Sequence, residues 1–392
     1  MDRRTFLGVG LGALAPWSAA SWSWAMPSEQ RMRARSIGIV IGFMEPGPLN
    51  AITDVPGVRV GHVTLVSGEG PLVVGEGPVR TGVTAILPHG GMLSKEACHA
   101  ADFTLNGNGE LTGVGLVRQR GILAAPILFT NTSSVGNAYD GALEWMMDRD
   151  PTLFNRGYRI EPVVGETWGD FLNDTAGRHV RPEHAYEAIE TAQSGPVEEG
   201  CVGGGTAMRA FNFKAGIGTA SRIVTCADAR YTVGVIVQSN FGRRDQLRVD
   251  GVPVGREMPE RMPQRGSDKK NKSLLVAVAT DAPLIPVQLQ RLCKRASMGL
   301  ARTGAISSHG SGDLFIAFST GKNVVQEQPA DLFALKNRWI SHLHQAVIEA
   351  TEESILNSLT MAHSMTGRDG NTYHALPLDS LVQIMRAHGR IK

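Results

Sequence analysis

The sequence predicts an α+β protein in which helices and sheets pack as layers. Three features of the residue pattern indicate this class. Most apolar segments are short and rich in β-branched residues, clear helical patterns are few, and the two kinds of segment do not alternate strictly along the chain. Strict alternation is typical of a doubly wound parallel sheet, so a Rossmann-type fold fits poorly and an α+β layered sandwich fits better.

Six segments are predicted as strands because β-branched residues dominate them and because glycine, proline, asparagine or aspartate bounds most of them. Glycine accounts for 46 of the 392 residues, against a usual share of about 7%. This excess has no collagen-like period and indicates tight turns and closely packed backbone. The predicted strands are Ser36–Ile41, Val58–Thr64, Gly82–Leu87, Ile127–Thr130, Tyr231–Val237 and Ser273–Thr280.

Four helices are predicted from apolar residues that recur at helical spacing. In the longest of them, Ile340, Leu343, Val347, Ile355 and Leu359 form one apolar stripe. The last helix is short and follows a proline, which is common at helix starts. The predicted helices are Asn137–Met147, Pro286–Gly299, Asn337–Ala362 and Leu378–Ala387.

One segment, Gly242–Lys272, interrupts this pattern of strands and helices. It combines many arginines, lysines and acidic residues with Pro253, Pro259 and Pro263. Such a charge-rich segment usually is a solvated surface loop, which is what we predict here. A strongly apolar strand follows it directly, beginning at Ser273.

Charge and cysteine content exclude several classes of protein. The chain has 39 lysines and arginines against 37 aspartates and glutamates, a formal net charge of +2, which is too balanced for a nucleic-acid-binding surface. Its four cysteines are widely scattered, with no CxxC pair and no Cys/His spacing typical of zinc. We therefore expect no disulfide framework, no metal and no other cofactor.

The first 25 residues have the layout of an export signal. Arg3 and Arg4 precede the apolar run Phe6–Ala15, which is shorter than the roughly 20 residues of a membrane span but suits a signal peptide. An arginine pair followed by x-Phe-Leu is typical of the bacterial twin-arginine signal. The sequence therefore predicts a signal peptide over residues 1–25 and a periplasmic protein, with no membrane span once the signal is removed.

The common motifs of several enzyme classes do not occur. The glycine-rich segments match neither GxGxxG at a strand–helix junction nor GxxxxGK[ST], so phosphate binding is disfavoured. The sequence also contains no HExxH and no GxSxG. A zinc hydrolase of the HExxH type and an α/β-hydrolase are therefore disfavoured.

Ser273 is the residue whose position suggests chemistry. By residue type alone, a serine between a loop and a strand is usually a cap or turn residue. The alternative is a nucleophile in a hydrolase that cuts its own chain. Cleavage before Ser273 would leave its hydroxyl beside a new α-amine with a pKa of about 7.7–8.0. That amine suits a general base near neutral pH, so one residue would supply both nucleophile and base.

Twelve segments, in order along nearly the whole mature chain, carry a family resemblance. The first reads Ile-Thr-Asp-Val-Pro-Gly-Val-Arg-Val-Gly-His. On these segments the chain resembles the L-aminopeptidase/D-esterase family, which includes the β-peptidyl aminopeptidases. The segments are Ile52–His62, Thr104–Gly113, Asn131–Gly136, Gly165–Trp168, Leu172–Asp174, Val202–Thr206, Phe213–Arg222, Val237–Gly242, Ser273–Pro283, Leu300–Gly304, Gly310–Asp313 and Glu349–Asn357.

The resemblance implies a fold and a processing event. The family's fold is a four-layer α/β/β/α sandwich like that of N-terminal-nucleophile hydrolases, but its elements are connected in a different order. Its self-cleavage site corresponds to the bond between Lys272 and Ser273. The resemblance thus implies one hydrolase domain made of an α chain, residues 26–272, and a β chain, residues 273–392. It also implies a homo-oligomer of αβ units.

The resemblance also assigns roles residue by residue. Ser273 would be the nucleophile, Asn240 would stabilise the oxyanion, and Ser311 and Asp313 would support the nucleophile. Glu166 would bind the amine of the substrate. The family has a tyrosine two residues after that glutamate, assisting the oxyanion, and this chain has Trp168 there.

The implied function is a self-cleaving serine aminopeptidase acting on short peptides, amides or esters with a free N-terminal amine. Two departures from the family pattern, Lys272 before the cleavage site and Trp168 in place of tyrosine, leave alternatives open. One is an amide-oligomer hydrolase like the nylon-oligomer hydrolases of similar fold. The other is an uncleaved, non-catalytic periplasmic binder of amino compounds.

Overall fold

The computed structural model describes residues 30–154, 160–258, 262, 272–325 and 334–391. The predicted signal peptide lies outside these residues, and so do residues 263–271 before the predicted cleavage site. The described residues from Arg31 onward form one compact unit.

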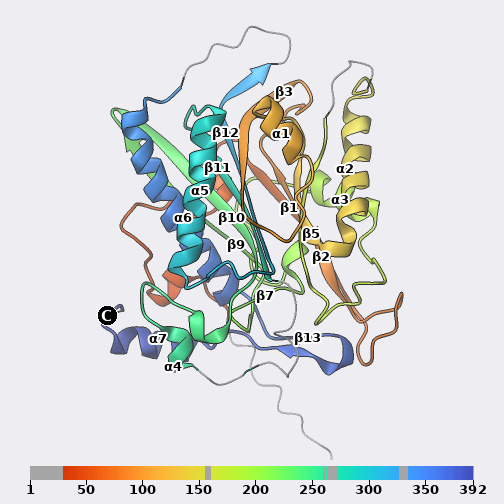
Figure 1. Cartoon of the computed structure of the whole chain (residues 1–392), viewed down its shortest axis with the longest axis vertical. Coiled ribbons are helices and arrows are strands. Elements are labelled where there is room, and N and C mark those ends of the chain that lie inside the picture. The colour runs from red at the N-terminus through yellow and green to blue at the C-terminus, as the bar shows by residue number, and fades with distance from the viewer. Residues whose placement is uncertain (1–29, 155–159, 259–261, 263–271, 326–333, 392) are drawn as a thin grey trace, which may run out of the picture. The chain divides into compact units, whose positions relative to one another are not determined.

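Two sheets lie at the centre of this unit (Figure 1). The smaller has the strand order β1-β2-β5-β6 and the larger the order β4-β3-β12-β11-β10-β9. Within them, β5 pairs with β6 and β11 with β12 in parallel, and the other neighbours are antiparallel. The smaller sheet consists of β1 (Arg59–Ser67), β2 (Val79–Leu87), β5 (Ile127–Asn131) and β6 (Val163–Thr167). The larger consists of β3 (Glu96–Gly107), β4 (Ile122–Leu123), β9 (Ile217–Cys226), β10 (Ala229–Asn240), β11 (Lys272–Thr280) and β12 (Ser311–Val325).

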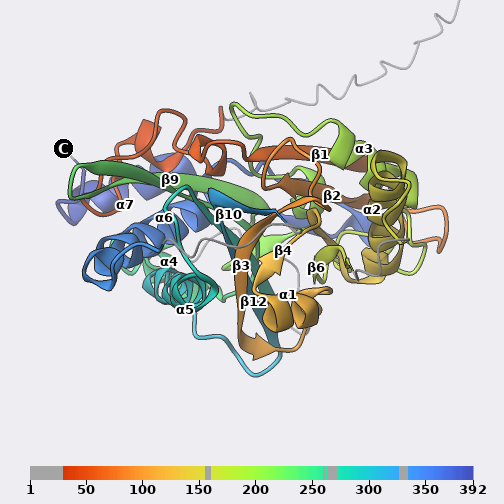
Figure 2. The ribbon, with the colours of Figure 1, turned by 90° about the horizontal axis from the view of Figure 1, so that it is seen from above.

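Helices cover the outer face of each sheet (Figures 1 and 2). Helices α2 (Val135–Arg149) and α3 (Pro182–Glu190) lie on the smaller sheet, and α5 (Pro286–Arg302) and α6 (Ile340–Thr360) lie on the larger. Among the described residues, no helix is both long and apolar enough to cross a membrane. The remaining elements are α1 (Val114–Arg120), α4 (Val254–Glu257), α7 (Leu378–Ala387), the pair β7 (Arg209–Ala210) and β8 (Phe213–Lys214), and the pair β13 (Met365–Thr366) and β14 (Thr372–Tyr373).

Three apolar cores separate the four layers. Leu128 of β5 packs with Ala142 of α2 in the core under the helices of the smaller sheet. Leu275 of β11 lies in the core between the two sheets, and its neighbour Val276 lies in the core under α5 and α6. Since successive strand residues point to opposite faces, each central strand contributes to two cores. The α/β/β/α sandwich expected from the family resemblance is therefore confirmed.

Glycines let the helices approach the sheets closely. A Cβ at Gly218 of β9 would lie 1.9 Å from the carbonyl oxygen of Ser354 in α6. A Cβ at Gly61 of β1 would lie 2.1 Å from the carbonyl oxygen of Ala188 in α3. Both positions exclude any side chain, which explains part of the glycine excess in the sequence.

Most predicted elements are confirmed, with one wrong and several missed. The predicted strand Ser36–Ile41 is wrong: Ala34–Ile37 form a short 3-10 helix. Gly38, at φ 86°, ends that helix in the left-handed conformation and turns the chain away from an extended path. Elements that the periodicity did not predict include β3, β6, β9, β12 and α3.

The predicted solvated loop Gly242–Lys272 is wrong over its first part. Leu247, Val249 and Val254 are fully buried in the core beside the larger sheet. Arg244 is 5% exposed, and its guanidinium donates to the carbonyl oxygens of Phe211, Asn212 and Met258. Backbone carbonyl oxygens thus satisfy a buried guanidinium that the sequence pattern predicted to be exposed to solvent.

Candidate active site

Ser273 lies at the start of β11, at the end of the space between the two sheets. Its side chain is buried, with 2% of the residue exposed. It pairs with Asn240 across the antiparallel β10 and with Gly312 on the parallel β12. Ser273 shares a strand face with Leu275, which lies in the core between the sheets. Within the described part of the chain, the Ser273 hydroxyl has no hydrogen-bond partner.

Asn240 ends β10 directly opposite Ser273. Its Nδ2 donates to the carbonyl oxygen of Trp168 at 2.8 Å, and its Oδ1 accepts from the backbone N–H of Arg209 at 3.4 Å. These bonds hold the buried amide in one orientation. A side-chain amide nitrogen carries two N–H groups, so one remains for an oxyanion formed beside Ser273.

Glu166 is a buried carboxylate in β6, 5% exposed. Thr132 Oγ1 donates to Glu166 Oε2, and the backbone N–H of Glu110 donates to Oε1 at 3.2 Å. Burial raises the pKa of the Glu166 carboxyl above its ordinary value, while these two hydrogen bonds act in the opposite direction. The carboxylate is thus a poorly solvated group that a cation would stabilise.

Glycine contacts place the Glu166 carboxylate close to the strand that flanks Ser273. A Cβ at Gly109 would lie 3.1 Å from Glu166 Oε1 and 3.3 Å from the Cα of Gly312. Gly312 is the residue beside Ser273 on the neighbouring strand. Gly109 therefore separates the carboxylate from the strand that flanks Ser273, and its lack of a side chain keeps them close.

Gln238 joins the two sheets at this end. Its fully buried Nε2 donates to the carbonyl oxygen of Thr130 at 2.9 Å and to Thr167 Oγ1 at 2.7 Å. These bonds connect β10 with the ends of β5 and β6. They position Glu166 and Trp168, on either side of Thr167, against the end of β10 that carries Asn240.

Ser311 and Asp313 form a hydrogen-bonded pair beside Ser273. Ser311 Oγ donates to Asp313 Oδ2 at 2.6 Å and accepts from Asn106 Nδ2 at 3.0 Å. Strand register places Ser311 beside Lys272 and Asp313 beside Leu274, one residue on each side of Ser273. Burial raises the pKa of Asp313, although hydrogen bonds that include those from Ser311 and the Leu274 N–H lower it. Neither residue is hydrogen-bonded to Ser273 in the described residues.

The structure thus brings together every residue that the resemblance assigned to the site. It adds Thr132, Gln238 and Asn106, to which no function was assigned from the sequence. Thr132 follows directly after β5 within one of the resembling segments, which is the only signal that pointed toward it. Within the described part of the chain, no group of three or more histidine, cysteine, aspartate or glutamate side chains could hold a metal ion.

This arrangement has the parts of an acyl-transfer site for a cationic substrate. Ser273 offers a hydroxyl, and Asn240 offers an N–H where negative charge would develop. Glu166 offers a buried carboxylate on the facing sheet. A ligand with an amine close to a carbonyl would satisfy both ends of the site.

Comparisons with known proteins show the family of the chain. The model of peptidase family S58 matches residues 50–373. The chain is 45% identical to the β-peptidyl aminopeptidase BapA of Sphingosinicella microcystinivorans over 93% of this chain and 94% of that protein. The solved structure of the PH0078 protein from Pyrococcus horikoshii OT3 is similar, with a TM-score of 0.88, 46% identity and coverage of 92% of this chain and 100% of that one.

A second solved structure is similar in fold to this chain. The solved L-aminopeptidase D-Ala-esterase/amidase from Ochrobactrum anthropi, a variant of the N-terminal-nucleophile hydrolase fold, is 37% identical with a TM-score of 0.85. The similarity covers 92% of this chain and 99% of that chain. The family resemblance seen in the sequence is therefore confirmed: the chain belongs to peptidase family S58, a family of hydrolases that includes aminopeptidases.

Proposed function

We propose that the protein is a self-cleaving serine aminopeptidase that forms an acyl-enzyme on Ser273. Its substrates would be short peptides, amides or esters with a free N-terminal amine. The observation that carries the proposal is the position of Ser273, which is buried and pairs with Asn240 on one side and Gly312 on the other. Gly312 contacts Gly109, which in turn lies against the Glu166 carboxylate. The names of the relatives support the same class of substrate.

Self-cleavage would begin with attack of Ser273 Oγ on the carbonyl carbon of Lys272. The peptide bond breaks as the acyl group moves from nitrogen to oxygen, and water then hydrolyses the ester. The products are a carboxylate at Lys272 and a free α-amine at Ser273. The remaining N–H of Asn240 would stabilise the oxyanion in the first step.

Substrate turnover would use the same hydroxyl with the new α-amine as its base. The amine accepts the hydroxyl proton while Oγ attacks the substrate carbonyl, and it then protonates the departing amine. Water attacks the resulting ester and regenerates Ser273. The Ser311–Asp313 pair, one residue away on either side in the strand register, would orient this amine once it is free.

The Glu166→Gln variant tests recognition of the substrate amine. Glutamine preserves the side-chain shape but removes the charge that pairs with an ammonium in a poorly solvated pocket. We expect kcat/KM for unblocked substrates to fall by about 10²-fold, a value typical of losing one partner of a buried charge pair. N-acetylated substrates should be very poor for the native enzyme. Equal turnover of free and acetylated substrates would exclude this role for Glu166.

The raised pKa of Glu166 predicts how binding depends on pH. As pH falls through that pKa, Glu166 becomes neutral and no longer pairs with the ammonium. KM should therefore rise at pH values at which an ordinary glutamate, with a pKa of about 4.3, is still ionised. Ionised Glu166 also lowers folding stability above its raised pKa, so the Gln variant should melt no lower than the native protein. A KM–pH profile that is identical in the Gln variant would contradict this assignment.

The Trp168→Tyr variant tests the departure from the family at this position. A tyrosine hydroxyl could donate to an oxyanion beside Asn240, which already contacts the Trp168 carbonyl. Adding such a donor is worth up to about 10²-fold in kcat, and more for amides than for esters because the amide leaving group is poorer. We expect a selective rise in amide kcat, measured on a matched amide and ester pair. A change confined to KM would show that residue 168 only shapes the pocket.

Export through the twin-arginine route is part of the proposal. The support is the sequence layout of residues 1–25, in which Arg3 and Arg4 precede a short apolar run. Replacing both arginines by lysine should leave the protein in the cytoplasm, as measured by cell fractionation with a periplasmic marker. Full periplasmic delivery of this variant would exclude that route.

A further inference from the structure

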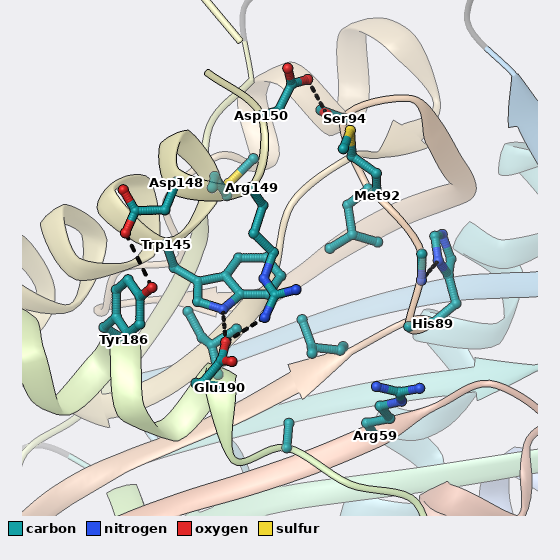
Figure 3. A pocket seen from close by; sticks show the side chains of 17 residues that line it. Arg59, His89, Met92, Ser94, Trp145, Asp148, Arg149, Asp150, Tyr186 and Glu190 are labelled. Carbon is teal, nitrogen blue, oxygen red and sulfur yellow. Dashed lines mark hydrogen bonds and ion pairs between the residues drawn. The ribbon is translucent and has the colours of Figure 1, made fainter. Parts of the chain in front are cut away.

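A second cavity lies on the outer side of the smaller sheet, enclosed by the ends of β1, β2, α2 and α3 and by the segment 88–95 (Figure 3). Its volume is about 520 Å³, within the usual range of roughly 300–1,000 Å³ for small-molecule sites. None of the residues that line it belongs to the active site described above.

The cavity and the active site lie at opposite ends of the smaller sheet. Leu87, in the cavity wall, ends β2, and Ile86 beside it pairs with Ile127 at the start of β5. Glu166 is at the other end, near Thr132, which follows β5. Helix α2 begins soon after Thr132 and ends in the cavity wall, and its 15 residues span about 22 Å.

One wall of the cavity carries a carboxylate that its neighbours hold in place. Glu190 Oε2 accepts from Trp145 Nε1 at 2.8 Å and from Arg149 at 2.5 Å. The Arg149 guanidinium also lies over the Trp145 ring, 4.7 Å from its centroid. Within the described residues, both of these bonds use Oε2, and Oε1 accepts no hydrogen bond. One oxygen of an oriented carboxylate is therefore available to a ligand.

Arg59 supplies a cation at the same cavity. Its backbone pairs with Leu87 in the smaller sheet, but its exposed side chain forms no hydrogen bond or ion pair with any residue that the structure describes. Figure 3 shows its guanidinium turned toward the cavity interior. A Cβ at Gly90 would lie 2.3 Å from Arg59 Nη2, so the backbone of the 88–95 segment packs against the guanidinium. A planar group with unused donors suits a carboxylate.

The remaining charges limit the kind of ligand. Asp148 accepts from the Tyr186 hydroxyl at 3.1 Å, and Asp150 accepts from Ser94 Oγ at 2.7 Å. With Glu190, the cavity has three carboxylates against the two guanidinium groups of Arg59 and Arg149. An excess of negative charge repels phosphates and other multiply charged anions. A ligand with one positive and one negative group would meet both Glu190 Oε1 and Arg59 without adding net charge.

Apolar side chains line the space between these polar groups. Leu87, Leu93, Trp145 and Ile189 are each less than 8% exposed and contribute to the cavity wall. They offer an apolar ligand side chain a surface from which it would displace water.

We propose that this cavity binds a free amino acid with an apolar side chain. Its carboxylate would pair with Arg59, its ammonium with Glu190 Oε1, and its side chain would lie against Leu93 and Trp145. The ligand class follows from the charges of the cavity itself and does not depend on the proposed catalytic function. An aminopeptidase would release molecules of this class as products.

The test is calorimetric titration of L-leucine into the full chain carrying Ser273→Ala and Glu166→Gln. The Glu166→Gln substitution removes the carboxylate that would bind the leucine amine in the active site. We expect saturable binding that Arg59→Gln weakens at least ten-fold, as expected for loss of a charged hydrogen bond. Arg386→Gln, an exposed substitution on α7, is the matched control and should leave the affinity unchanged. In the otherwise native chain, Arg59→Gln should leave peptide hydrolysis intact, which separates this site from the catalytic one.

Two analogues test the zwitterion directly. 4-Methylpentanoate lacks the amine and 3-methylbutylamine lacks the carboxylate, so each should bind at least ten-fold more weakly than leucine. The affinity for 3-methylbutylamine should be unaffected by Arg59→Gln, because this analogue has no carboxylate. The affinity for 4-methylpentanoate should be unaffected by Glu190→Gln, because this analogue has no amine. The proposal is overturned if leucine shows no saturable binding at millimolar concentration, or if its affinity is unchanged by Arg59→Gln.

Discussion

The Ser273→Ala variant is expected to remain one full-length chain and to lose hydrolytic activity. Alanine lacks the hydroxyl that would attack the carbonyl of Lys272, so neither the acyl shift nor the free α-amine should form. Loss of a nucleophile that acts together with its base lowers kcat by roughly 10⁵-fold or more. The substitution is small and the Ser273 hydroxyl bonds to no described residue, so the fold should persist.

A denaturing gel and N-terminal sequencing measure this result. The native protein should give two bands, and the smaller chain should begin Ser-Leu-Leu-Val-Ala. Ser297→Ala, on the outer part of α5, is the matched control and should cleave and react normally. Cleavage of the Ser273→Ala chain would contradict the mechanism. A native protein that stays in one band and does not hydrolyse peptides would support an uncleaved binder of amino compounds.

The Asn240→Asp variant is expected to lower kcat by about 10²–10³-fold, the usual effect of losing one oxyanion donor. Aspartate keeps an oxygen that can accept from the Arg209 N–H, but it has no N–H for the oxyanion or for the Trp168 carbonyl. Its negative charge would also repel the oxyanion. The change should fall on kcat more than on KM, and self-cleavage should slow as well.

The measurement is steady-state kinetics on the processed protein, with thermal melting to check the fold. Asn371→Asp is a matched control because Asn371 Nδ2 donates to the Phe171 carbonyl at 2.9 Å outside the site. It removes a similar amide–carbonyl bond and should leave kcat unchanged. If Asn240→Asp alters only the melting temperature, its role is structural and the oxyanion donor is another group.

Local patterns in the sequence predicted the elements that carry the site. The β-branched run at Ser273–Thr280 matches β11 to within one residue at its start, and the proline before Leu378–Ala387 marks the beginning of α7 correctly. The Ser36–Ile41 segment shows where this fails. Its Ile39 and Ile41 are buried as in a strand, but a left-handed Gly38 directs them into the core without strand pairing. Burial pattern alone does not distinguish these cases.

By itself, the sequence determined the family, the layered α+β class and the candidate roles of Ser273, Asn240 and Glu166. Strand and helix periods can be seen in the sequence because they depend on residues close together in the chain. Each resembling segment likewise is continuous in the sequence, so the family can be identified without the structure. Only the tertiary structure decided that Thr132 holds Glu166, that Gln238 joins the sheets, and that Arg59 and Glu190 line the same cavity. These contacts join residues that are far apart in the chain. Which side chains meet depends on how the layers pack against one another, and no local sequence pattern links residues on separate elements.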